Sequence, residues 1–309
     1  MNGIANAVKS EANPHLISHS TVVPIEQLIA EARLRIDDYP GAEVSKPDML
    51  LMLDQLLEHP VGRSVFIGKG LDCEATQFFI NGCKHETNPL ICWIFDKAPA
   101  NMATRERFGV FQRELQKRLR SGMHLASVPC GVMDDLLGLD LTGLHGVSFT
   151  GIDLDEKSLM LAKANAQKNE LSGISNFHES DAWNLGSFEA HFDILTSNGL
   201  NIYVADNEKV IALYKEFFRT LKPGGVLITS FLTPPPVLGG TTWKNIDPVD
   251  ASKQRILFCT VIGAQWQHFR SEETTKSQLQ SAGFENIEVI YDSQGMFPTV
   301  VAARPLVKE

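Results

Sequence analysis

The chain has 309 residues, 43% of them hydrophobic and 21% charged, and these proportions exclude a disordered or fibrous polymer. Residues 1–120 hold 14 basic and 15 acidic side chains, and the remainder holds 14 and 22, so the net charge of −9 lies mostly in the second part. An acidic body argues against a nucleic-acid partner. Five scattered cysteines, no run of 18 apolar residues and no apolar signal core predict a cytoplasmic protein without a membrane span.

The first 120 residues have a helical pattern. Residues 1–20 are polar and without period, so we expect a flexible tail. Residues 21–120 are predicted to form an all-helical module, because apolar residues recur at intervals of three and four. The faces that carry this signal are Ile25, Leu28, Ile29 and Ala32; Met49, Leu53 and Leu56; and Phe108, Phe111, Leu115 and Leu119.

From residue 121 to the end, short β-rich runs alternate with amphipathic segments. Such alternation predicts an α/β domain with a parallel sheet covered on both faces. Strands are expected at 123–129, 147–154, 174–179, 192–197 and 225–232, and helices at 132–141, 156–169, 207–221 and 272–282. Segments 287–291 and 296–302 are typical of an antiparallel pair. Three prolines at 234–236 open a stretch to about 270 that we expect to be irregular.

The turns after the strands are the places to search for a site, since ligands of open α/β sheets bind at the carboxyl ends of the strands. The first turn covers residues 127–133. Its Gly131 allows a ligand to approach the backbone, and the amides of the next helix favour an anionic group. A single glycine also occurs in such turns for geometry alone.

Two aspartates follow the second strand. Asp153 is expected at its exposed end, about 22 residues after Gly131, where a carboxylate can accept hydrogen bonds from both hydroxyls of a ribose. Asp155 is expected to cap the following helix instead.

The third and fourth turns add further polar groups. Asp181 after the third strand suits the recognition of a purine edge, in which a carboxylate accepts from the exocyclic amine, although a surface aspartate is the alternative. Residues 196–203 after the fourth strand lie where a reacting group would meet the ligand.

These motifs resemble those of class I S-adenosylmethionine (SAM)-dependent methyltransferases over roughly residues 120–305. The resemblance rests on Gly151-Ile152-Asp153, Asp181-Ala182, Phe192–Leu195 and Leu221-Lys222-Pro223-Gly224-Gly225. It implies a seven-stranded, mostly parallel Rossmann-like sheet with the last strand antiparallel. It also implies cofactor-binding residues: Pro129, Cys130 and Gly131 at the methionine part, Asp153 with Leu154 at the ribose, Asp181 with Ala182 at the adenine, and Asn198 near the sulfonium.

The first turn departs from the family pattern. Family members usually carry an acidic residue followed by Gly-x-Gly-x-Gly, whereas this chain has Ser127, Pro129, Gly131 and Met133 at these places. Only the middle glycine is kept. The carbonyl of Pro129 can still accept from the ammonium of the cofactor, and Met133 adds bulk beside it.

The resemblance implies methyl transfer from SAM, by in-line displacement, to an O, N or C nucleophile, with S-adenosylhomocysteine (SAH) as product. Positioning supplies much of such catalysis, so a general base is optional. The catalytic residues are unknown; His268 and Tyr203 are the candidates, while His178 is expected to be structural. We expect no metal, because Cys83, His85 and Cys92 lack a second Cys-x-x-Cys pair.

The acceptor and the role of the helical module stay open. The resemblance implies a cap that closes over cofactor and acceptor and favours a small molecule, but the apolar faces of the module can equally form a homodimer. A methyltransferase with a protein acceptor is one alternative. A non-catalytic SAM-binding or scaffold protein is another, because the first turn is eroded; a nicotinamide oxidoreductase is disfavoured by the lack of Gly-x-Gly-x-x-Gly.

Overall fold

The computed structural model describes residues 23–81, 86–264 and 267–306, and it contains one seven-stranded sheet. The strand order is β3-β2-β1-β4-β5-β7-β6. Strands β1 to β5 run parallel, and β7 is antiparallel to both of its neighbours, as predicted. The strands are β1 (His124–Ser127), β2 (Ser148–Asp153), β3 (Ser175–Glu179), β4 (Phe192–Ser197), β5 (Leu221–Ser230), β6 (Glu285–Ile290) and β7 (Thr299–Ala303).

Two apolar layers bury the faces of the sheet. Successive residues of a strand point to opposite faces, so Leu125 and Ala126 of β1 join different clusters. One face is covered by α9 (Asn207–Thr220) and α11 (Glu272–Ser281), the other by α6 (Pro99–Arg118), α7 (Asp134–Leu137) and α8 (Glu156–Lys168). Strands β2, β4 and β7 are accordingly buried at nearly every residue.

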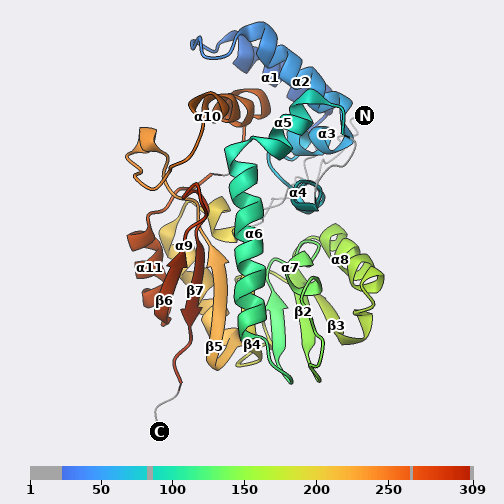
Figure 1. Ribbon diagram of the computed structural model, residues 1–309, viewed down its shortest axis with the longest axis vertical. Coiled ribbons are helices and arrows are strands. Elements are labelled where there is room, and N and C mark those ends of the chain that lie inside the picture. The colour runs from blue at the N-terminus through green and yellow to red at the C-terminus, as the bar shows by residue number, and fades with distance from the viewer. Residues whose placement is uncertain (1–22, 82–85, 265–266, 307–309) are drawn as a thin grey trace, which may run out of the picture.

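The remaining helices form a cap above the sheet (Figure 1). It contains α1 (Ile25–Asp37), α2 (Lys46–Glu58), α3 (Pro60–Ile67), α4 (Cys73–Asn81) and α5 (Pro89–Asp96). The long helix α6 runs from the cap down along the sheet (Figure 1), and its Phe111 and Leu115 pack in the sheet core.

A later segment of the chain completes the cap. Helix α10 (Pro248–Arg255) continues into a π-helix, η4 (Ile256–Ile262), whose Ile256, Leu257 and Val261 are fully buried against α1 and α2. The expectation of an irregular stretch to residue 270 was therefore wrong for 248–262. The η4 part of this segment is helical because its apolar side chains fill the core of the cap, and Asp247 caps the start of α10.

Several other predicted elements, among them the strand expected at 123–129, are shorter than expected, and two of them have a clear structural cause. The helix predicted at 132–141 is the single turn α7, because Met133 takes a left-handed φ of 59° at its start and Gly138 ends it. Strand β7 begins at Thr299 rather than 296, because backbone N–H groups of Gln294, Met296 and Phe297 donate to the Asp292 carboxylate and form a tight loop. The tail predicted at 1–20 lies outside the described residues.

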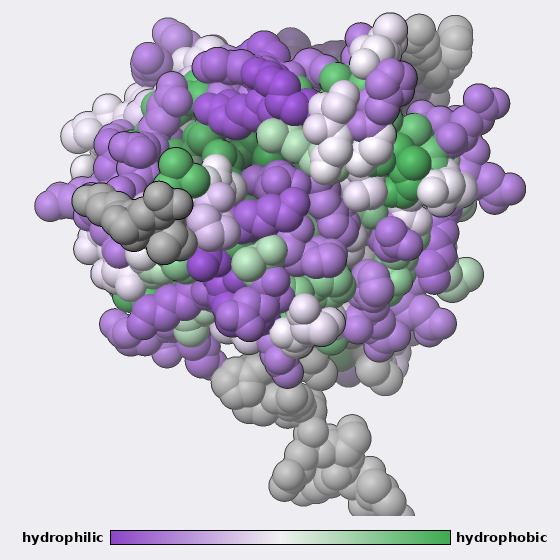
Figure 2. All heavy atoms as spheres, turned by 90° about the horizontal axis from the view of Figure 1, so that it is seen from below, coloured by the Kyte–Doolittle hydropathy of each residue, from purple (hydrophilic) through white to green (hydrophobic). Residues whose placement is uncertain are grey.

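The end of the molecule opposite the cap is mainly polar. Figure 2 shows hydrophilic side chains over most of this face, with apolar residues in small separate groups. Among the described residues no helix is both long enough and apolar enough to cross a membrane.

Candidate active site

A cavity of about 530 Å³ lies between the cap and the sheet. Its floor is formed by the turns after β1, β2, β3 and β4, and its roof by α3, α4 and the loop between them. Strand β1 has β2 on one side and β4 on the other, so the connections diverge at this point of the sheet. Such a switch point is where open α/β sheets bind ligands.

All eight residues predicted to bind the cofactor line this cavity: Pro129, Cys130, Gly131, Asp153, Leu154, Asp181, Ala182 and Asn198. Of the catalytic candidates, Tyr203 lines it as well. His268 is not among the lining residues; its backbone N–H donates to the carbonyl of Ile202 at 3.0 Å. His178 is exposed on β3 and contacts the ring of Phe188.

The first turn is tied to the second through Asp153. Its Oδ2 accepts from the backbone N–H of Gly131 at 2.9 Å, and its Oδ1 accepts from that of Asp155 at 3.0 Å. Asp153 is only 8% exposed, so the expected exposed strand end is in fact buried. Burial raises the pKa of this carboxyl, and the backbone hydrogen bonds oppose the rise. Four lone-pair sites serve two donors here, which leaves acceptor capacity for hydroxyl groups.

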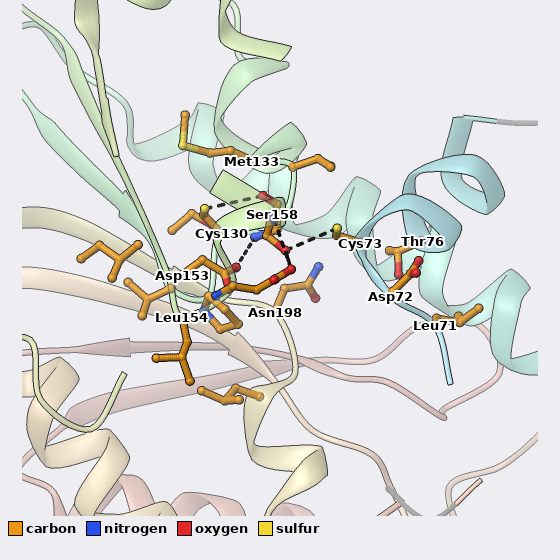
Figure 3. A pocket seen from close by; sticks show the side chains of 18 of the residues that line it. Leu71, Asp72, Cys73, Thr76, Cys130, Met133, Asp153, Leu154, Ser158 and Asn198 are labelled. Carbon is orange, nitrogen blue, oxygen red and sulfur yellow. Dashed lines mark hydrogen bonds between the residues drawn. The ribbon is translucent and has the colours of Figure 1, made fainter. Parts of the chain in front are cut away.

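The bulk of Met133 is accommodated by the protein. Its sulfur would lie 3.0 Å from a Cβ added at Gly151, and Cys130 Sγ would lie 3.1 Å from it. Met133 is fully buried, and in Figure 3 its side chain points away from Asn198 and Asp72. The missing glycine at 133 is thus matched by a glycine on the neighbouring strand.

The third turn is fixed in the same way. The backbone N–H of Ser180 donates to the carbonyl of Asp153 at 3.0 Å. Asp181 Oδ1 accepts from the N–H of Trp183 at 3.0 Å, and Ala182 beside it is buried. The second and third turns therefore present their carboxylates along one edge of one cavity.

Asn198 follows β4 and faces the cap. Its Oδ1 is buried without a hydrogen-bond partner in the part of the chain that the structure describes. Figure 3 shows its amide opposite Asp72 and Thr76 of the cap, across open space. Because a buried polar atom without a partner is costly, this amide is suited to a ligand in the cavity.

Sequence reasoning missed Asp135, which also lines the cavity. It lies on α7, is 5% exposed, and accepts from Thr196 Oγ1 at 2.5 Å and from Ser127 Oγ at 3.0 Å. Burial raises its pKa. The available signal was the absence of an acidic residue at position 127 together with an aspartate pair seven and eight residues later.

The cap contributes the roof and a second missed carboxylate. Asp72 accepts from Ser64 Oγ at 2.6 Å and from the backbone N–H of Ala75 at 2.7 Å. The other roof and wall residues include the apolar Ile67, Leu71, Ile80 and Phe108 and the polar Ser64, Thr76 and Gln77.

Side-chain contacts fasten α4 to the sheet domain. Ser158 Oγ donates to Cys73 Sγ at 3.4 Å, and Gln77 Nε2 donates to Asp134 Oδ2 at 3.0 Å. Lys157 forms an ion pair with Glu74. The roof is therefore anchored on α7 and α8, beside the first two turns.

Tyr203 stands at the far end of the cavity near a buried arginine. Burial raises the pKa of the Tyr203 phenol, and the positive charge of Arg107 opposes the rise. Arg107 is 6% exposed, donates to Ser230 Oγ at 3.3 Å, and has its pKa lowered to about 10 by burial. The phenol is therefore protonated near neutral pH.

The described residues contain no group of three or more His, Cys, Asp or Glu side chains arranged to hold a metal ion. Cys83 and His85 lie outside the described residues.

Comparisons with known proteins agree with this geometry. A family model described as a methyltransferase domain matches residues 119–276, just over half of the chain. Over 208 residues the chain is 24% identical to a demethylmenaquinone methyltransferase from Staphylococcus saprophyticus, covering 61% of this chain and 82% of that one. Over 109 residues it is 32% identical to a ubiquinone biosynthesis O-methyltransferase from Coxiella burnetii, covering 35% and 43%.

One solved structure resembles the whole architecture, cap included. A possible exported protein from Bordetella parapertussis is 39% identical, with a TM-score of 0.86 over 91% of this chain and 95% of that one. The combination of cap and sheet thus occurs in a second protein. With its methyltransferase-domain match and its seven-stranded sheet, the chain belongs to the class I SAM-dependent methyltransferases.

Proposed function

We propose that the enzyme transfers the methyl group of SAM to an O, N or C nucleophile of a small organic molecule held under the cap. The observation that carries this proposal is the cavity of about 530 Å³ between the strand-end turns and the partly apolar roof. Its volume is in the range of small-molecule sites. The relatives named for demethylmenaquinone and for ubiquinone biosynthesis support a small acceptor.

The residues that line the floor fit the cofactor. Asp153 would accept from the ribose hydroxyls, Asp181 with Ala182 would contact the adenine, and the turn Pro129–Gly131 would adjoin the methionine part. The unpartnered Asn198 Oδ1 supports a polar or charged group of the ligand beside it. When bound, SAM supplies a methyl group that its sulfonium makes electrophilic.

The roof would hold the acceptor and exclude water. Its apolar side chains favour an acceptor with an apolar body, and exclusion of water strengthens the electrostatic contacts inside. Because the Tyr203 phenol is protonated, its role would be to donate a hydrogen bond to the acceptor and orient it, rather than to remove a proton. His268 lies away from the lining residues, and its position does not support a role as base.

A reducing compartment fits the thiols. The cysteines that the structure describes, Cys73, Cys92, Cys130 and Cys259, are free. We therefore retain the cytoplasm as part of the proposal.

Two measurements test the proposal in sequence. SAM or SAH at 100 times its dissociation constant is expected to raise the free energy of unfolding by about 2.7 kcal/mol. Radiolabelled methyl groups from SAM are then expected to appear in members of a panel of small phenols, amines and enols, and not in protein or RNA added to the same reactions. Labelled protein would favour the protein-acceptor alternative, and binding without transfer to any of these acceptors would favour the non-catalytic one.

A further inference from the structure

We infer that Asp135 of α7 binds the α-ammonium group of the cofactor, in place of the acidic residue that the resembled family carries at the position of Ser127. The inference rests on the proposed function. It assigns the charge of the first turn to a residue outside that turn.

The Asp135 carboxylate is buried beside the cavity. Asp135 is 5% exposed and lines the cavity. No Lys, Arg or His nitrogen from the described part of the chain forms an ion pair with it. A buried carboxylate without a cation is costly, so its retention beside a cavity indicates a cationic ligand.

Two hydroxyl groups from neighbouring strands contact the Asp135 carboxylate. Ser127 at the end of β1 and Thr196 on β4 each donate a hydroxyl to Asp135. Two hydroxyl donors orient the carboxylate from the floor of the cavity, and with the backbone N–H of Leu136 they still leave lone-pair capacity for a ligand. Ser127 stands where the family has its acid, so the replacement residue holds the displaced carboxylate.

The charged side chains that line the cavity are mainly acidic. Six of its lining residues are aspartates, and the single basic one, Lys157, is paired with Glu74. Four of the other aspartates accept from backbone N–H groups, and Asp134 accepts from the amide of Gln77. Asp135 accepts from the hydroxyl groups of Ser127 and Thr196, and neither of these donors carries a charge. The described residues place no positive charge in an ion pair with Asp135, and the ammonium group of the cofactor would provide one.

The test separates the amino-acid part of the cofactor from the nucleoside. Isothermal titration calorimetry would compare SAH with 5′-methylthioadenosine, which has the same nucleoside and sulfur but no ammonium. Asp135→Asn keeps the shape of the side chain and removes its charge. We expect its affinity for SAH to fall at least tenfold and its affinity for methylthioadenosine to stay within twofold of the wild type.

Asp140→Asn is the matched control, since it removes the same charge from an exposed residue that does not line the cavity. We expect its SAH affinity to stay within about threefold of the wild type. The melting temperature of the ligand-free Asp135→Asn variant should be no lower than that of the wild type, because the amide avoids a buried charge while the two hydroxyls can reorient.

Three results would overturn the inference: unchanged SAH affinity in Asp135→Asn, an equal loss for SAH and methylthioadenosine, or an equal loss in Asp140→Asn. Failure of the proposed function looks different, because the wild type would then transfer no methyl group to small acceptors, whatever the affinities of these variants for SAH and methylthioadenosine.

Discussion

Asp153 connects the fold to the site at the level of a single residue, because its carboxylate accepts two backbone N–H groups and still faces the cavity. We predict that Asp153→Ala lowers SAH affinity at least tenfold and lowers the free energy of unfolding by about 1–3 kcal/mol, since two buried donors lose their acceptor. Calorimetry and urea unfolding measure the two effects. A folded variant with wild-type SAH affinity would remove Asp153 from the cofactor site.

We expect substitutions at Tyr203 and His268 to have different effects on kcat. Tyr203 lines the cavity and His268 does not. With an acceptor identified from the panel, Tyr203→Phe is expected to lower kcat at unchanged SAH affinity, because the orienting hydroxyl is lost. His268→Ala is expected to leave kcat within about twofold. Steady-state kinetics decide between the two residues, and the reverse ranking would contradict the assignment.

The sequence predicted those cavity-lining residues that lie at or just after the carboxyl end of a strand. Asp153, Asp181 and Asn198 could be found because parallel strands end at one edge of the sheet. Asp135 and Asp72 could not be found in this way. Asp135 lies on a helix, and its contacts with two strands hold it beside the cavity. Asp72 belongs to the cap, and the position of the cap depends on tertiary packing.

At the level of elements, Asp155 is the N-cap residue of α8, as predicted. Its side chain accepts from the backbone N–H of Ser158 at 3.2 Å. Asp155→Ala is expected to lower the free energy of unfolding by about 1 kcal/mol, because the first turn of the helix loses its cap, and Asp155→Ser should recover most of it. Urea unfolding of the three proteins measures this. Equal stability of the alanine and serine variants would contradict the capping role.

Strands β1 and β2 carry a pH-sensitive contact. The ring Nε2 of His124 lies 2.7 Å from Thr150 Oγ1, and burial lowers the pKa of His124 to about 4. His124 therefore binds a proton below about pH 6.5 in the unfolded chain, but only below about pH 4 in the folded protein. Stability contributed by this residue is fully present above pH 6.5 and is lost as the pH falls toward 4.

We predict a loss of about 2–3 kcal/mol from this histidine across that window. His124→Gln keeps a hydrogen-bonding side chain and removes the titration, so its stability should fall less than that of the wild type between pH 7 and pH 4. Urea unfolding at several pH values gives both curves. Parallel curves would show that His124 does not cause the loss.

For the whole molecule, the cap is built from two separate parts of the chain. Helices α1, α2 and η4 share one apolar core, although nearly the whole sheet domain lies between α2 and η4 in sequence. The first part was predictable from its apolar period. The second was not, because three prolines precede it and its nearly uninterrupted apolar run gives no helical face until it is packed.

This arrangement places the roof of the cavity between anchors at both ends. One anchor is the shared core of the cap, and the other is the set of contacts from α4 to α7 and α8. The cavity is thus a product of the complete chain, and the central claim is that the nucleoside of SAM binds inside it.

A crystal structure of the protein with SAH tests that claim most directly. We predict electron density for the ribose at Asp153, for the adenine at Asp181 and Ala182, and for the sulfur near Asn198. A nucleoside bound elsewhere, or bound in the cavity without contact to either aspartate, would contradict it.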